Sequence, residues 1–241
     1  MAFILDHIVT TIIVTTLFFS MVATQFRVQE TGMAQVSSHA AKSKALSLGQ
    51  WVDQDIVALG ENIVDNSARF GNPMPDSFAV QFIDEFGAKQ TRTMTYTKEW
   101  RFFSDRFVGA AKQRQATRYL VVVQPDSIEV ELSDGSTYTR PAFQLVRTQS
   151  IWKAVDPVTD LVGFTLADFT EDGRSVSTLS QFRIQLLDND GNLFADSDPV
   201  APDQASYVRV DFSMVPEFEL RQNYLRELYW TTTLKVRPFW G

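Results

Sequence analysis

The sequence contains no cysteine and only two histidines among its 241 residues. The missing cysteines exclude a disulfide framework, a thiolate metal site and a cysteine nucleophile. With only two histidines, one of them His7 beside a long apolar run, neither a multi-histidine zinc site nor a histidine-based catalytic triad is expected. The sequence also lacks a glycine-rich phosphate loop and a serine-centred elbow. We therefore expect no enzymatic activity, no cofactor, no metal and no small-molecule substrate.

Basic residues are outnumbered, with 22 Lys and Arg against 29 Asp and Glu and a formal net charge of −7. Because binding to a phosphate backbone requires a basic surface, nucleic acid is not an expected partner. Once an N-terminal helix is set aside, the remaining chain is long enough for one well-buried globular domain.

Residues 8–23 carry no charge and consist mostly of Ile, Val, Leu, Phe and Met. Extended to residues 2–24, this segment matches the roughly 20 residues that a helix needs to cross a bilayer. Hydroxyls of its threonine pairs, residues 10–11 and 15–16, can bond to carbonyls one turn earlier. A cleaved secretory signal is the alternative, but it requires a basic start and a small-residue cleavage site, and residues 22–24 offer a poor one. The sequence predicts a membrane anchor that is retained.

Asp6 stands near the start of this anchor, where a carboxylate in lipid is costly unless it is paired or lies at the interface. One interpretation places Asp6 and His7 among lipid headgroups. The other pairs Asp6 with a cation on a neighbouring subunit, such as a free N-terminus, which makes Asp6 an assembly residue. If Met1 is removed before the small Ala2, Asp6 becomes the fifth residue of the chain.

A helical pattern continues beyond the anchor to about residue 63. Its apolar positions are spaced by four, four, three and four residues, which places them on one face of a helix. They are expected to pack against the following domain: Leu48, Val52, Ile56, Leu59 and Ile63. Asp53, Gln54, Asp55 and Glu61 lie off this face. The whole helix is predicted to span 55–65 residues, on the order of 90 Å at about 1.5 Å per residue, and to end at Gly60 or Asn66.

The rest of the chain has strand signals at short intervals, separated by turn residues, which indicates an antiparallel sheet. Alternating apolar residues mark strands near residues 78–82, 94–97, 119–123, 128–132, 164–169, 182–186, 208–212 and 228–236, with turns at residues 133–136, 171–173 and 188–192. Residues 109–117 are expected to form a loop or a short helix. The predicted domains are a transmembrane segment (1–24), an amphipathic continuation of the helix (25–70) and a β-rich globular head (71–241). The fold class is α+β, with a long N-terminal helix packed on an antiparallel sheet.

Two polar groups allow more than one interpretation. The oxygens of Asp188, Asp190 and Asn192, with Asp196 and Asp198 nearby, could hold calcium, but turn preferences favour a simple hairpin turn. A basic group is either solvated loop charge or an interface with an acidic partner or lipid headgroups: Arg101, Arg106, Lys112, Arg114 and Arg118. Trp100, Trp152, Trp230 and Trp240 are expected in the core or at its rim.

In its order of features the chain resembles the type IV pilin-like superfamily, which includes the larger minor pilins and the pseudopilins of type II secretion. Four parts carry the resemblance: the uncharged start with an acid near it, the helix end at residues 46–60, the strands at 143–147, 158–164 and 182–186, and the closing strand at 229–237. The N-terminus diverges, because this family has a basic leader ending in Gly followed by Phe-Thr-Leu-Ile-Glu.

The resemblance implies a structural subunit of an envelope filament or secretion pseudopilus. Its partners would be other pilin-like subunits, contacted through the N-terminal helix, and membrane lipid. Its head would lie outside the cytoplasm, in a cell-surface or periplasmic filament. The alternative function is a single-pass, membrane-anchored β domain that binds a ligand or partner at the cell surface.

Overall fold

The computed structural model describes residues 2–63, 69–83, 88–108, 111–131, 137–153, 170–194, 204–216 and 227–236. The chain divides into two compact units, Met1–Ala40 and Ala41–Gly241. The predicted turn at residues 133–136, the predicted strand at 164–169, and Asp196 and Asp198 lie outside the described residues.

Helix α1 (Ala2–Val57) is 56 residues long and contains no proline. Thr11 and Thr16 donate hydrogen bonds of 2.8 Å to the carbonyls of His7 and Ile12, which confirms the predicted back-bonding. The helix ends at Val57, so its 56 residues fall within the predicted length, and Gly60, one of the two predicted stops, adopts a φ of 70° in the turn that follows. This left-handed conformation, which glycine adopts without strain, stops the helix.

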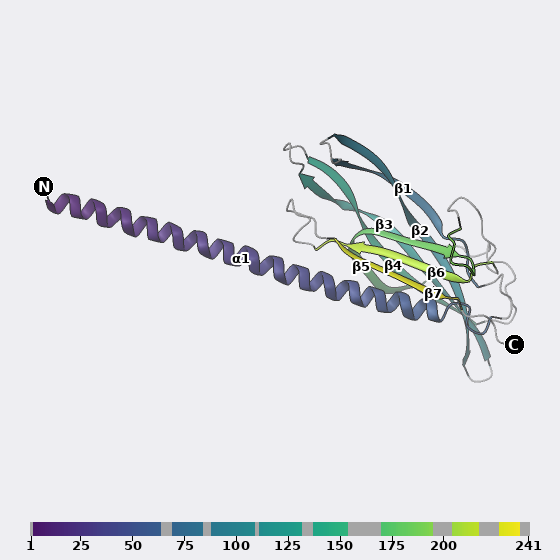
Figure 1. The fold of residues 1–241 in the computed structure, drawn as a ribbon. Coiled ribbons are helices and arrows are strands. Elements are labelled where there is room, and N and C mark those ends of the chain that lie inside the picture. Colours follow the sequence, from purple (N-terminus) through teal and green to yellow (C-terminus); the bar gives the residue numbers. More distant parts are fainter. Residues whose placement is uncertain are drawn as a thin grey trace. The chain divides into compact units, whose positions relative to one another are not determined.

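The described residues contain seven strands, all paired antiparallel with their neighbours in chain order (Figure 1). They are β1 (Met74–Ile83), β2 (Lys89–Val108), β3 (Ala111–Glu131), β4 (Thr137–Lys153), β5 (Thr170–Leu187), β6 (Tyr207–Met214) and β7 (Leu228–Lys235). The fold is therefore α+β, as predicted, with one long N-terminal helix and an antiparallel sheet.

Two local predictions are wrong. Residues 111–117, expected as a loop or short helix, form the first part of β3 and pair with β2. The polar side chains of Arg114 and Thr117 fit a strand because each finds a partner on a neighbouring strand, Asp105 and Gln149 respectively. Residues 171–173, expected as a turn, lie within β5, where these three residues face the single residue Thr148 of β4 between the pairs Arg147↔Arg174 and Gln149↔Thr170. The turn-forming residues thus make a bulge inside a strand.

The sheet curls so that β2 approaches β5. Strand β5 pairs with β4 up to Leu179 and with β6 from Leu179 onward, and it bends at Thr178, whose φ is 67°. Beyond the bend, the Ile184 N–H donates a 2.8 Å hydrogen bond to the Thr97 hydroxyl of β2. This side chain satisfies a backbone group that β4 no longer reaches, and it ties the two parts of the sheet together.

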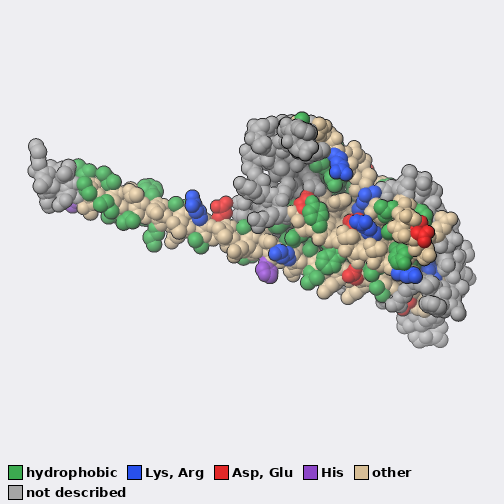
Figure 2. Space-filling model, in the orientation of Figure 1, with side chains coloured by type: hydrophobic (Ala, Val, Ile, Leu, Met, Phe, Trp, Pro, Cys, Tyr) green, Lys and Arg blue, Asp and Glu red, His purple; other side chains and the backbone are tan. Residues whose placement is uncertain are grey.

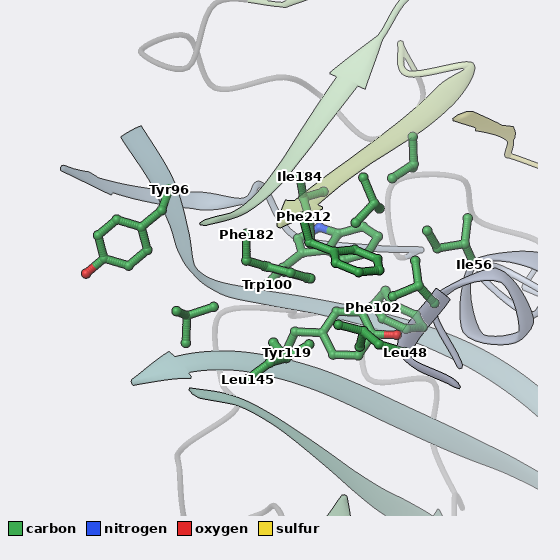
Figure 3. Close-up of a cluster of buried hydrophobic side chains, with 14 of the residues drawn as sticks. Leu48, Ile56, Tyr96, Trp100, Phe102, Tyr119, Leu145, Phe182, Ile184 and Phe212 are labelled. Atoms are coloured by element: carbon green, nitrogen blue, oxygen red, sulfur yellow. The ribbon is translucent and has the colours of Figure 1, made fainter. Parts of the chain in front are cut away.

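The core lies between the sheet and the C-terminal part of α1, as Figure 3 shows. Leu48 and Ile56 of the helix face aromatic side chains from several strands. The largest of these are fully buried: Trp100, Tyr119, Phe143, Phe182 and Phe212. The helix is therefore part of the core of the second unit and does not merely lie on its surface.

Candidate functional site: the docked end and the exposed start of α1

The five predicted apolar positions are buried in the second unit, but only Leu48, Val52 and Ile56 lie on α1, because the other two follow its end at Val57. Leu48, Val52 and Leu59 are 0% exposed, and Ile56 and Ile63 are 1% exposed. All but Ile63 belong to the same hydrophobic cluster as the sheet residues. At about 25 cal/mol per Å², burying such side chains is the main free energy that holds the helix on the sheet.

Gly49 lies on one flank of this apolar face, against Trp230 of β7. A Cβ atom at Gly49 would come within 2.7 Å of two ring carbons of Trp230. The missing side chain therefore allows the indole to pack directly on the helix backbone. Trp230 also stacks on Phe212, with an interplanar angle of 13°.

Asp55 lies on the opposite flank, about 120° from Gly49 around the helix axis at 3.6 residues per turn. Its carboxylate accepts hydrogen bonds from Arg147 Nε at 2.5 Å and Arg147 Nη2 at 2.6 Å. The Tyr119 hydroxyl donates a third, at 2.6 Å, to the same carboxylate. All three side chains are buried. The helix is thus joined to β3 and β4 by a fork-shaped ion pair and a phenol, at a point where water is excluded.

This environment changes the acidity of Tyr119. Burial first, and then the neighbouring Asp55 carboxylate, raise the pKa of the Tyr119 hydroxyl well above its ordinary value. The phenol therefore stays protonated as a donor to Asp55 at all moderate pH values. Removing the charge of Asp55 or of Arg147 would leave the other charge buried without a partner, which lowers the free energy of unfolding. The intact ion pair is not by itself evidence of high stability, because burying both charges is also costly.

Asp55 is predicted from the helical spacing to lie off the apolar face, but its contact with the sheet is not predicted. A signal was present in the strand pattern, because Phe143, Leu145 and Arg147 alternate with outward positions and so share one face of β4. Phe143 and Leu145 are core residues. An arginine continuing a core-facing row requires a buried acid, and Asp55 is an acid beside the helix's apolar face.

The basic group in β2 and β3 is paired within the chain, so its interpretation as solvated loop charge is wrong for the described members. Arg114 Nε donates to Asp105 Oδ1 at 2.8 Å, with both side chains largely buried. Arg118 and Arg101 both donate to Glu99, at 2.8 and 2.5 Å. The side chains of Arg106 and Lys112 lie outside the described residues.

Two opposing effects act on the pKa of Glu99. Burial raises the pKa of Glu99, but the hydrogen bonds from Arg118 and Arg101 outweigh burial, so the pKa lies below its ordinary value. Each of these three arginines is thus paired with a carboxylate of the same chain, so these guanidinium groups are not free for an acidic partner.

Residues 188–192 form the predicted turn, which is held by hydrogen bonds to the Asp188 side chain. Asp188 accepts the backbone N–H groups of Asp190 and Asn192 at 2.8 Å, and the Asn192 side chain at 3.0 Å. These bonds, first that of the Asn192 side chain, lower the pKa of Asp188. Within the described parts of the chain, no group of three or more His, Asp or Glu side chains is placed to hold a metal ion.

The first unit is the exposed part of α1. In the described residues, one helix, taken from His7 to Val57, is long and apolar enough to cross a membrane. Hydrophobic side chains are exposed at intervals along this helix, among other side chains and backbone (Figure 2). The side chain of Asp6, the predicted assembly residue, lies outside the described residues, and the predicted pairing of Asp6 stays a prediction.

Beyond residue 24 the helix surface is mixed, yet large apolar residues remain exposed. Phe26 is 66% exposed, Met33 59% and Val36 71%. With Gln29 and Ala40 they are spaced by three, four, three and four residues. Such spacing forms a single stripe along a helix. We call these five residues the α1 stripe.

Comparisons with known proteins identify no relative. No protein-family model matches the chain, and neither a curated protein nor a solved structure matches it.

Proposed function

We propose that this protein is a membrane-anchored structural subunit of a pilin-like filament or secretion pseudopilus, assembled through the N-terminal part of α1. The observation that carries the proposal is the exposed apolar surface of α1. It is long enough to enter a bilayer, and it continues beyond residue 24 as the α1 stripe. An exposed apolar surface of this kind marks a membrane or protein interaction site.

The second support is the way the helix ends. Its last turns are buried in the sheet and fixed by the Asp55–Arg147 ion pair. One helix therefore serves both parts of the molecule, with apolar surface at its start and core residues at its end. This arrangement, a long helix whose end completes an antiparallel sheet, is the one implied by the resemblance to type IV pilin-like proteins.

Asp6 provides the chemical test of assembly. In lipid, a carboxylate is stabilised by a positive charge on an adjacent subunit. Asp6→Ala should leave the sheet folded and the protein in the membrane, but should reduce its incorporation into the assembly. Asp6→Glu should be tolerated better than Asp6→Asn if charge is required. The measurement is filament yield or co-purification at matched expression.

Two results would contradict the proposal. Equal incorporation of Asp6→Ala and the parent would leave Asp6 as a headgroup residue and remove the link to assembly. N-terminal sequencing that begins at or after Thr24 would show that the anchor is cleaved. A retained anchor without any assembly would favour the alternative, a single-pass β domain that binds a partner at the cell surface.

A further inference from the structure

We infer that the α1 stripe binds the same stripe on a second copy of the chain, with the two helices parallel and in register. The inference rests on the proposed function, because a common anchor in one membrane brings the two helices together in the same orientation. It goes further by naming the partner, the contact residues and their alignment.

The spacing of the stripe is that of a helix-to-helix seam. In a seven-residue repeat, Phe26, Met33 and Ala40 take the first core position, and Gln29 and Val36 take the second. The same repeat extends backward through Ile8, Ile12, Thr15, Phe19 and Val22. A repeat averaging 3.5 residues keeps the stripe facing one partner helix along its whole length, whereas a surface that faces lipid alone has no need of it.

Gln29 determines the kind of partner. Its amide is both a donor and an acceptor, so two copies of Gln29 facing each other can satisfy one another. A single polar residue in an apolar seam specifies alignment, because any other register leaves it unpaired. A shift by one repeat would place Gln29 against Val22 or Val36. An antiparallel arrangement would place it against residues of the other core position, such as Phe26 or Met33.

The opposite side of the helix carries mostly polar residues, with one exposed valine, Val28 (66% exposed), and it provides a control surface. Thr24, Thr31, Gln35 and Ser38 lie roughly 180° from the stripe at 3.6 residues per turn. Gln35 is exposed, as Met33 is. From Phe26 to Ala40 the seam is short, about 21 Å at 1.5 Å per residue, so its pairing depends on the high local concentration that a shared membrane provides.

Disulfide trapping tests the inference directly, because the natural chain has no cysteine. The full-length protein carrying Met33→Cys is oxidised in its membrane with copper–phenanthroline. A symmetric disulfide requires the two Cα atoms to lie within about 7 Å, which only a parallel, in-register pair provides at this position. We expect about tenfold more disulfide-linked dimer for Met33→Cys than for the matched control Gln35→Cys, given this distance limit.

A second variant tests the role of Gln29. Adding Gln29→Glu to the Met33→Cys protein places two carboxylates opposite each other and should reduce the dimer yield several-fold, because like charges in a seam repel. Equal dimer yields from Met33→Cys and Gln35→Cys, or none from either, would overturn the inference. If filaments form without the Met33 disulfide, the in-register pairing is wrong and the proposed function stands. If dimers form without filaments, the pairing stands and the proposed function fails.

Discussion

Asp55, in the last turn of α1, accepts two hydrogen bonds from Arg147, which lies 92 residues further along the chain on β4. Both side chains are buried, and Tyr119 donates a third hydrogen bond to the same carboxylate. This contact joins the helix to the middle of the sheet, and it explains why the end of α1 belongs to the core.

Removing one partner of this pair should be strongly destabilising. Arg147→Met leaves a buried carboxylate without its counter-charge, and we expect the free energy of unfolding to fall by about 3–5 kcal/mol. The double variant Asp55→Leu/Arg147→Met should lose less than the sum of the two single variants, because no uncompensated charge remains. Denaturant titration of the four proteins in detergent measures this coupling.

The Arg209–Asp211 pair is the matched control, since the Arg209 side chain is 40% exposed. Arg209→Met should change the free energy of unfolding by no more than about 1 kcal/mol. Additive effects of the two changes at Asp55 and Arg147 would mean that the ion pair does not hold the helix on the sheet.

Alkaline pH should weaken the same contact through Tyr119. Its pKa is raised above the ordinary value of 10.0 by burial and by Asp55. Below about pH 10 the phenol is protonated in both folded and unfolded chains, so stability is unaffected. Above that value the unfolded chain releases a proton that the folded chain keeps, and the free energy of unfolding falls by up to about 1.4 kcal/mol per pH unit for this group.

Tyr119→Phe should reduce this alkaline slope, and the exposed Tyr229 provides the control. The measurement is chemical denaturation between pH 8 and pH 11, roughly the range of tyrosine ionisation. An unchanged slope in Tyr119→Phe, or the same reduction in Tyr229→Phe, would contradict the assignment of the titrating phenol.

Gly49 should not tolerate a methyl group. Alanine is the better helix former by about 1 kcal/mol, but its Cβ would lie 2.7 Å from the Trp230 ring. We expect Gly49→Ala to be destabilising and to change the fluorescence of the displaced indole. Gly32→Ala is the control in the same helix, because nothing lies within 4 Å of its Cβ position. If both substitutions stabilise the protein, Trp230 does not pack on the helix.

The buried face of the helix can be tested with two adjacent residues. Ile56 is 1% exposed and Val57 is 43% exposed. Ile56→Ala should reduce the free energy of unfolding by about 2–5 kcal/mol, whereas Val57→Ala should change it by less than about 0.5 kcal/mol. Similar losses for the two variants, measured by denaturant unfolding, would mean that this face of α1 is not packed on the sheet.

The sequence predicted the features that depend on local periodicity. Ile56 and Leu59 follow the helical spacing, and the alternation of Phe182, Ile184 and Leu186 marks β5, because each pattern reports which side is buried. The Asp55–Arg147 contact depends on how distant segments meet, and local spacing carries no such information. The first part of β3 was missed for a similar reason, since its polar residues become compatible with a strand only through partners such as Asp105 for Arg114.

The central claim is that α1 carries this chain into a linear assembly, and electron microscopy of the native envelope tests it most directly. A single cysteine replacing Thr233, an exposed position of β7, allows a gold label to be attached to the full-length protein. The account predicts labels spaced regularly in rows along linear assemblies. Labels scattered singly over the membrane, with the sheet folded, would contradict it.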